Sequence, residues 1–171
     1  WDEAMRDFTR AIELDPACAS AYSDRATTRG VMGDKEGALA DYDQAILIQP
    51  NFAPAYVNRG LHYRQRGDLE KALADYDRAI EIAPKIAVTW ANRGNLRWQM
   101  GDLTGARSDY EHHLEMVPDN WRVWAGFAQF LDKTGHPEEA REAVLKALKF
   151  APPEMRSRLE ADFSSLLQRG G

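Results

Sequence analysis

The side chains that could support catalysis or hold a metal ion are scattered along the sequence. His112 and His113 are neighbours, so on a helix they point about 100° apart. Neither has a His or Cys three or four residues away, as a metal-binding helix face requires. The lone Cys18 can form no internal disulfide, and we interpret it as a packing residue. Hydrolase, zinc-protease and phosphate-loop motifs are absent, so we expect no enzymatic activity, no metal and no cofactor.

The most regular charged residues are arginines and aspartates. Both recur at one fixed interval, and each arginine precedes its aspartate by the same distance, namely Arg25, Arg59 and Arg93, then Asp41, Asp75 and Asp109. In the next period Phe127 replaces the arginine and Ala143 replaces the aspartate. Because both change together, we predict a ladder of Arg–Asp pairs, across two helices or between adjacent repeats. The alternative is that the arginines bind an acidic ligand.

Composition limits the class of protein. The chain has 171 residues, of which 44% are hydrophobic and 29% charged, with a net charge of −5. An acidic balance argues against a nucleic-acid partner. No apolar run reaches the roughly 20 residues of a membrane-spanning helix, so we expect no membrane insertion.

The elements that position these residues repeat at the same interval, without an insertion. Three columns show the period, namely Gly33, Gly67, Gly101 and Gly135; Ala4, Ala38, Ala72, Ala106 and Ala140; and Pro16, Pro50, Pro84, Pro118 and Pro152. Each period contains two helical patterns, for example Ala53–Arg66 and Leu69–Ile82. The glycine suits a left-handed turn between the helices, the Asp after it can cap the second, and the proline follows that helix.

These columns resemble the tetratricopeptide repeat (TPR) family, which has an aromatic, Gly or Ala, Gly-Asp, Ala, aromatic, Ala and Pro at the same spacing. The spellings Asn-Arg-Gly at 58–60 and Ala-Asp-Tyr-Asp at 74–77 look most like bacterial members. The resemblance implies an all-α fold, a right-handed α-α superhelix (TPR solenoid) of antiparallel helix pairs. It divides one solenoid domain into 1–18, the second helix of a truncated repeat; repeats 19–52, 53–86 and 87–120; a divergent repeat 121–153; and a capping helix and tail 154–171.

The two ends of the array differ. Residues 154–168 place Met155, Leu159 and Phe163 on one helical face, as a capping helix does. Trp1 to Leu14 matches only the second helix of a repeat. We therefore expect a fragment of a longer TPR protein, or an N-terminal face that meets another chain by self-association or is simply tolerated.

The fourth repeat is unusually aromatic, with Trp121, Trp124, Phe127 and Phe130. We interpret these side chains as altered core packing rather than a ligand site. His113 occupies a column that is otherwise alanine, so we expect its ring to adjust the junction between the third and fourth repeats.

In the TPR family the first helix of each repeat lines the concave face that binds a partner. When the family's positions are transferred to this sequence, the resemblance implies a wider lining of the concave face that includes Ser23, Thr27 and Val57. It also implies a central binding set of Asn58, Leu61, Arg64, Gln65, Asn92, Asn95, Trp98, Gln99 and Gln129. Asn58 and Asn92 lie one period apart, and such amides can donate to and accept from a peptide backbone, although they could instead bond neighbouring helices. Lys and Arg are missing from the columns of the carboxylate clamp, so a chaperone C-terminus is not expected.

The sequence thus predicts a scaffold whose concave groove binds a protein or peptide partner. Two alternatives are a substrate-recruiting or regulatory arm of a larger enzyme and a self-assembling structural module. No residue identifies the compartment, and we take the cytoplasm only as the default.

Overall fold

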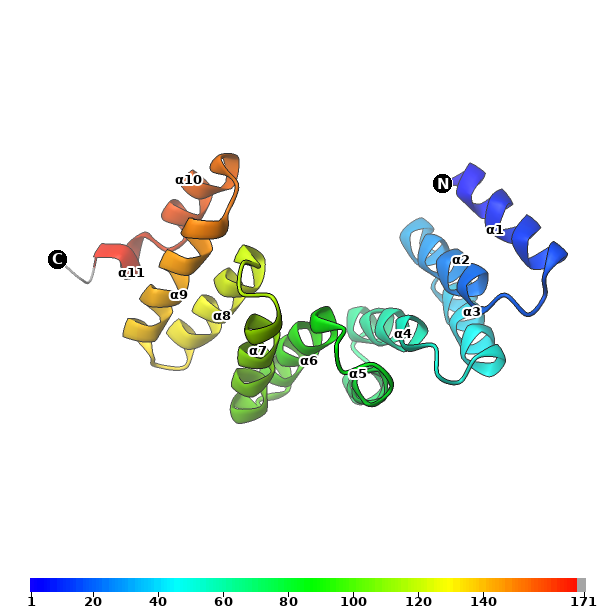
Figure 1. Ribbon diagram of the computed structural model, residues 1–171, viewed down its shortest axis with the longest axis horizontal. Coiled ribbons are helices and arrows are strands. Elements are labelled where there is room, and N and C mark those ends of the chain that lie inside the picture. Colours follow the sequence, from blue (N-terminus) through cyan, green and yellow to red (C-terminus); the bar gives the residue numbers. More distant parts are fainter. Residues whose placement is uncertain (169–171) are drawn as a thin grey trace. The chain divides into compact units, whose positions relative to one another are not determined.

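The repeated turn chemistry produces helices of 13 or 14 residues from α1 to α9. The structure, a computed structural model, describes residues 1–168 (Figure 1). Within that range there are eleven helices and no strand, namely α1 Asp2–Leu14, α2 Ala19–Met32, α3 Lys35–Ile48, α4 Ala53–Arg66, α5 Leu69–Ile82, α6 Ala87–Met100, α7 Leu103–Met116, α8 Trp121–Lys133, α9 Pro137–Phe150, α10 Pro153–Asp162 and α11 Ser164–Gln168. The predicted bounds of α4 and α5 are confirmed.

The turn between the two helices of a repeat depends on its glycine. The four glycines of the turn column all have a positive φ, between 86° and 90°. This left-handed conformation costs an L side chain energy but suits glycine. Asp34 and Asp102 then accept hydrogen bonds from backbone N–H groups of the second helix, whereas Asp68 makes no such capping bond.

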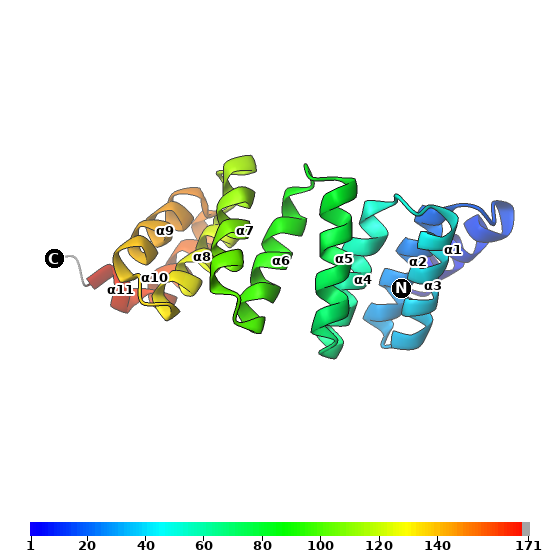
Figure 2. The ribbon, with the colours of Figure 1, turned by 90° about the horizontal axis from the view of Figure 1, so that it is seen from below.

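The chain divides into two units, Trp1–Asn92 and Arg93–Gly171, and the boundary falls within α6. In the first unit α2 packs against α3, α4 packs against α5, and α1 packs against α2. In the second unit α8 packs against α9, which also contacts α10 and α11. Figures 1 and 2 show α2 beside α3 and α8 beside α9 from two directions.

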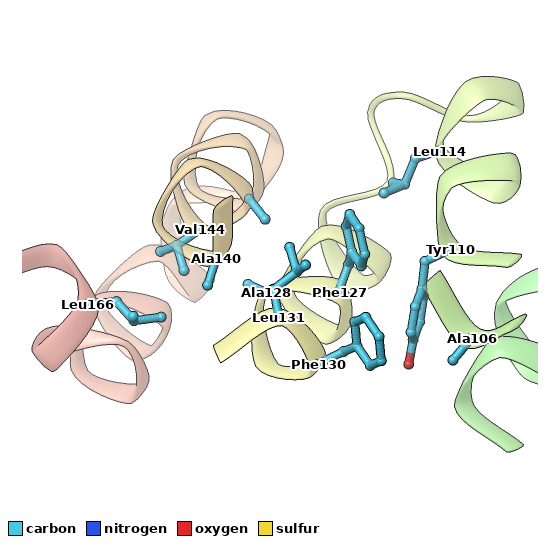
Figure 3. Packing of buried hydrophobic residues seen from close by; sticks show 11 residues of the cluster. Ala106, Tyr110, Leu114, Phe127, Ala128, Phe130, Leu131, Ala140, Val144 and Leu166 are labelled. Atoms are coloured by element: carbon cyan, nitrogen blue, oxygen red, sulfur yellow. The ribbon is translucent and has the colours of Figure 1, made fainter. Parts of the chain in front are cut away.

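The cores of the two units differ in the size of their side chains. In the first unit alanines dominate, and Ala26 and Ala38 pack with Tyr42. In the second unit Tyr110, Phe127 and Phe130 lie together with aliphatic residues from α8 and α9 (Figure 3). The interpretation of the fourth-repeat aromatics as core packing is therefore confirmed for the two phenylalanines. Trp124 packs against the same cluster, and both Trp121 and Trp124 pack against a second cluster that contains Ala147.

His113 ties α7 to the start of α8, as the junction prediction implied. Its ring is 2% exposed. The Asn120 amide donates to His113 Nε2 at 3.0 Å, and the side-chain oxygen of Asn120 accepts from the Val123 N–H.

The expectation of one capping helix is wrong in detail, because α10 and α11 are separate helices with Phe163 between them. The break lets Leu159 and Leu166 enter two different clusters of the core, while Phe163 packs against both. The predicted packing of Met155 is confirmed. Residues 169–171 of the predicted cap lie outside the described residues.

Candidate functional site

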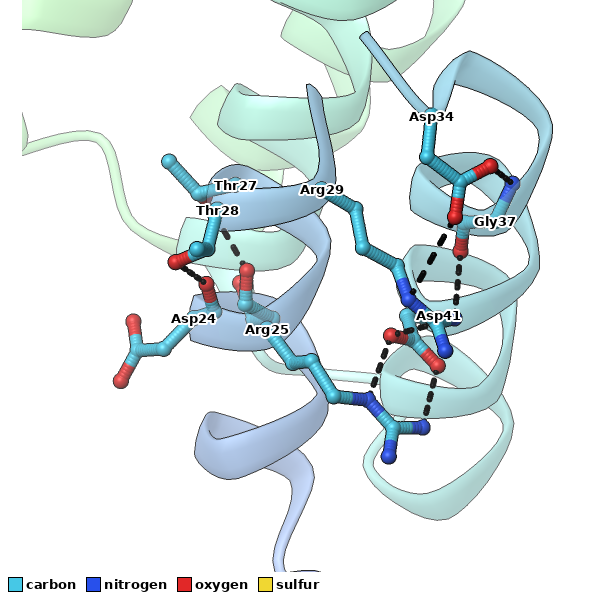
Figure 4. A network of polar contacts seen from close by, with 9 residues as sticks. Asp24, Arg25, Thr27, Thr28, Arg29, Asp34, Gly37 and Asp41 are labelled. Carbon is cyan, nitrogen blue, oxygen red and sulfur yellow. Dashed lines mark hydrogen bonds and ion pairs between the residues drawn. The ribbon is translucent and has the colours of Figure 1, made fainter. Parts of the chain in front are cut away.

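The Arg–Asp ladder is confirmed, and its pairs lie within a repeat, between the first and second helix. Arg25 donates from Nε and Nη2 to the two oxygens of Asp41 at 2.8 and 2.7 Å (Figure 4). The same two-bond geometry joins Arg59 to Asp75 and Arg93 to Asp109. The three aspartate side chains are at most 7% exposed. Because these arginines already hold a buried carboxylate, we interpret their column as structural rather than as a binding site for an acidic ligand.

A second arginine reinforces two of the three pairs. Arg29 lies 2.9 Å from Asp41, and Arg97 lies 3.0 Å from Asp109. The corresponding position of the other repeat is Tyr63, and there Arg59 itself bonds a second carboxylate, Asp43 of the preceding repeat, at 2.5 Å. Burial alone would lower the pKa of Arg59, but the bonds to Asp75 and Asp43 raise it above its ordinary value.

The tyrosines of the second helices show how the first-helix face is held in place. The hydroxyls of Tyr42 and Thr27 share a hydrogen bond at 3.0 Å, and the Tyr110 hydroxyl donates to Asn95 Oδ1 at 2.7 Å. The two partners occupy the same column of the repeat, at a constant spacing before their tyrosines. Asn95 is thus engaged by its own repeat, which satisfies its side-chain acceptor.

Tyr76 breaks this pattern because Leu61 occupies the partner column of its repeat. The ring is fully buried, and within the described residues its hydroxyl has no hydrogen-bond partner. Burial raises the pKa of Tyr76 to about 12.

Three predicted binding residues meet in one pocket of the first unit. Asn58, Leu61 and Gln65 of α4 line a hollow of about 270 Å³. The opposite side is formed by residues of α2 and α3, including Val31 and Tyr42. Val31 is 58% exposed, so an apolar surface lies beside the two amides.

His62 also lines this pocket, although the sequence motifs do not predict it as a binding residue. Its Nε2 lies 3.1 Å from the Lys35 carbonyl oxygen, and its ring lies 6.3 Å from that of Tyr42. The pKa of His62 is lowered, first because burial disfavours the charged ring and also because Arg66 and Lys35 repel a proton. Its column carries Leu96 and Phe130 in later repeats, and a histidine at such a core position is the signal that could have revealed it.

The other predicted binding residues do not share that pocket. In the first unit Arg64 and Asn92 are half-buried. In the second unit Gln99 is exposed, whereas Trp98 is half-buried and packs edge-on against Phe130 with ring centroids 5.6 Å apart. Trp98 is therefore partly a core residue.

Gln129 lines a pocket of about 610 Å³ in the second unit. One side of this pocket is α8, with Gly126, Gln129 and Lys133. The other side is formed by the end of α10 and by α11, through Leu159 and Phe163 among others. The capping helices thus extend the first-helix face of the last repeat.

Two members of the wider predicted lining are buried instead. Ser23 is 2% exposed and Val57 is 8% exposed. Both belong to the sides of α2 and α4 that turn into the first unit. Position in the repeat gave the correct helix for them but the wrong face.

Residues 1–168 contain neither a metal-binding cluster nor a membrane-spanning helix. No group of three or more His, Cys, Asp or Glu in residues 1–168 could hold a metal ion. Over the same range, no helix is long and apolar enough to cross a membrane.

Family models match the sequence of this chain, and solved structures match its fold. Tetratricopeptide repeat models match residues 53–86 and 97–161, which together make up more than half of the chain. No curated protein matches the sequence.

Among solved structures, the chain is similar to TTC0263, a thermophilic TPR protein of Thermus thermophilus, with 24% identity, a TM-score of 0.78, and 98% of this chain and 90% of that chain covered. It is similar to pilF of Pseudomonas aeruginosa, with 21% identity, a TM-score of 0.79, and 92% and 74% covered. It is also similar to YrrB, described as a TPR protein with an unusual peptide-binding site, with 20% identity, a TM-score of 0.74, and 94% and 87% covered. At these identities the likeness concerns the fold.

Proposed function

Because the chain belongs to the tetratricopeptide repeat family, we propose that it is an interaction module that binds an extended peptide segment of a partner protein. TPR proteins bind protein or peptide partners. The proposed site is the first-helix face of the repeats, and its centre in the first unit is the pocket with Asn58, Leu61 and Gln65. Asn95, Trp98, Gln99 and Gln129 belong to the same face of the second unit, and Arg64 and Asn92 complete the set.

The observation that carries the proposal is the composition of the first-unit pocket. Asn58 and Gln65 each offer an amide donor and an acceptor, which together can satisfy one peptide group of any sequence. Leu61 and Val31 offer apolar surface beside them. Its volume of about 270 Å³ suits one side chain of a peptide rather than a whole small-molecule substrate.

The peptide-binding site in the description of YrrB supports the proposal as a likeness of fold. The sequence supports it independently, because Asn58 and Asn92 recur one period apart and a peptide repeats its backbone groups along its length.

The test begins with a peptide library displayed on phage and selected on the full chain. The affinity of a selected peptide is then measured by calorimetry for the chain and for Asn58→Ala/Gln65→Ala. We expect a loss of about tenfold, since two hydrogen bonds of about 0.5–1.5 kcal/mol each would be removed. Both side chains lie at the surface of α4, so the variant should keep its helical circular dichroism.

The matched control is Gln49→Ala/Asn51→Ala, which removes two exposed amides from the loop after α3. This control should bind like the original chain. Equal affinities for all three proteins would place the peptide elsewhere and contradict the proposal.

A further inference from the structure

The fourth repeat lacks the ladder arginine, and its replacement turns inward. Phe127 is 7% exposed, and its ring lies 5.5 Å from that of Tyr110 and 6.0 Å from that of Phe130. Ala143, in the aspartate column, is also buried. The arginine of the earlier repeats is therefore replaced by core packing, and the ladder column supplies no guanidinium in this repeat.

In the first unit the ladder arginine does more than hold its aspartate. The guanidinium of Arg25 lies over the Tyr22 ring, 5.4 Å from the centroid, and that of Arg59 lies 5.6 Å from the Tyr56 centroid. Arg59 also bonds Asp43 on the second helix of the preceding repeat. An aromatic ring and a carboxylate thus form the outer surroundings of this guanidinium.

The counterparts of that ring and carboxylate are present in the second unit. Two periods after Tyr56 and Asp43 stand Trp124 and Glu111. The Tyr56 hydroxyl donates to the Pro50 carbonyl at 3.1 Å, and Trp124 Nε1 donates to the Pro118 carbonyl at 2.8 Å. Because the same bond to the same proline column fixes both rings, Trp124 has the position in its repeat that Tyr56 has in its own.

A cleft of about 300 Å³ lies where the guanidinium would stand. It is lined by Glu111, Leu114 and Glu115 of α7 and by Trp124 and Phe127 of α8. Glu115 adds a second carboxylate where the earlier repeat has Leu47. Within residues 1–168 no cation lies over the Trp124 ring.

The charged neighbours of the cleft leave room for a second cation. Arg107 Nε donates to Glu111 Oε1 at 2.9 Å, and the Glu111 side chain is still 48% exposed. Glu115 is 76% exposed and is 3.9 Å from His112 Nδ1. An adjoining hollow of about 150 Å³ brings in Glu142 and Lys146.

We propose that this cleft binds an arginine side chain of a partner protein, in the place that Arg59 occupies between Tyr56 and Asp43. A guanidinium is planar and weakly hydrated, so it stacks on an indole and bonds a carboxylate at the same time. The site lies between α7 and α8, on different residues from the proposed peptide-binding set, and does not depend on it.

The test uses the full chain labelled with ¹⁵N and two probes, N-acetyl-Gly-Arg-Gly-amide and the same peptide with citrulline. Citrulline keeps the shape of arginine but has no charge. The reporter is the indole N–H signal of Trp124, assigned as the signal that is absent from Trp124→Phe. We expect the arginine peptide to shift this signal saturably and the citrulline peptide to leave it in place.

The variant Glu111→Gln/Glu115→Gln should weaken binding of the arginine peptide about fivefold, because it removes both carboxylates and leaves only the ring. The matched control, Glu70→Gln/Glu81→Gln, changes two exposed glutamates of α5 and should bind as the original chain does. Three outcomes would each overturn the proposal: no shift with arginine, an equal shift with citrulline, or unchanged affinity in Glu111→Gln/Glu115→Gln.

Discussion

At the scale of single residues, the three tyrosines of one column differ in the hydrogen-bond partners of their hydroxyls. The Tyr42 hydroxyl is hydrogen-bonded to Thr27, and the Tyr110 hydroxyl is hydrogen-bonded to Asn95. For Tyr76 the equivalent position is Leu61, and its hydroxyl has no hydrogen-bond partner in the described residues. A buried polar group without a partner loses its bonds to water and gains nothing in return.

We therefore predict opposite results for two equivalent substitutions. Tyr76→Phe should leave the free energy of unfolding unchanged or raise it by up to about 1 kcal/mol, because it removes an unsatisfied hydroxyl. Tyr110→Phe should lower it by about 1 kcal/mol, because it removes the bond to Asn95. Urea unfolding followed by circular dichroism measures both, and a larger loss for Tyr76→Phe would contradict this account.

The ladder gives a second prediction at this scale. Asp75→Ala should lower the free energy of unfolding by about 3 kcal/mol, because Arg59 would keep a part-buried charge without its main partner. Asp43, which bonds the same arginine, is 60% exposed, and Asp43→Ala should cost less than about 1 kcal/mol. Guanidinium unfolding curves of the two variants compare them directly, and an unchanged stability of Asp75→Ala would show that the pair adds nothing.

At the scale of elements, small residues decide how closely paired helices approach. A Cβ on Gly60 of α4 would lie 2.9 Å from Tyr76 Cε1 and 3.3 Å from the Ala72 carbonyl oxygen. A Cβ added to Gly126 of α8 would have no neighbouring atom within 4 Å. The two glycines, each in the first helix of its repeat, thus have different surroundings. Gly60 lies in a close helix contact, whereas Gly126 lines an open pocket.

Two alanine substitutions test this difference. Gly60→Ala should lower the melting temperature, with a cost of about 1–3 kcal/mol from forcing α4 and α5 apart. Gly126→Ala should raise it, by about 0.5–1 kcal/mol, because alanine favours a helix and meets no obstacle. Differential scanning calorimetry gives the melting temperatures of the two variants. A lower melting temperature for both would mean that the added methyl group of Gly126→Ala also meets a steric obstacle.

At the scale of the whole molecule, burial is distributed unevenly among the helices. None of the residues of α1 is buried, whereas α8 buries Phe127, Ala128, Phe130 and Leu131. Local opening requires little energy where few apolar contacts are lost.

Hydrogen exchange should follow this distribution. Amides of α1 should exchange at the lowest free energy of opening and those of α8 at one of the highest. Exchange of the intact chain followed by peptic digestion and mass spectrometry measures both helices together. Equal protection of α1 and α8 would show that α1 is covered in solution by something other than α2.

The sequence alone determined the helix pairs, their turns and the pairing of arginine with aspartate. The helix pairs and their turns recur in every period and depend on local rules, and the Arg–Asp pairing recurs in three successive periods. A turn glycine is required by the backbone conformation at its own position, which no distant residue has to supply. The joint loss of an arginine and an aspartate in one repeat indicates that the two side chains are in contact in the others. The bounds of α4 and α5 could be predicted for that reason.

Only the tertiary structure decided which side of a helix is covered and which side chains from different helices meet. It buried Ser23 and Val57, divided the cap at Phe163, and brought Val31 and Tyr42 to the pocket that Asn58 of α4 lines. The hydrogen bonds of the tyrosine hydroxyls could have been predicted, because each tyrosine stands at a constant spacing from the position of its partner. The cleft beside Trp124 could not be read from spacing, because it exists only where Phe127 turns into the core and leaves an empty place next to the ring.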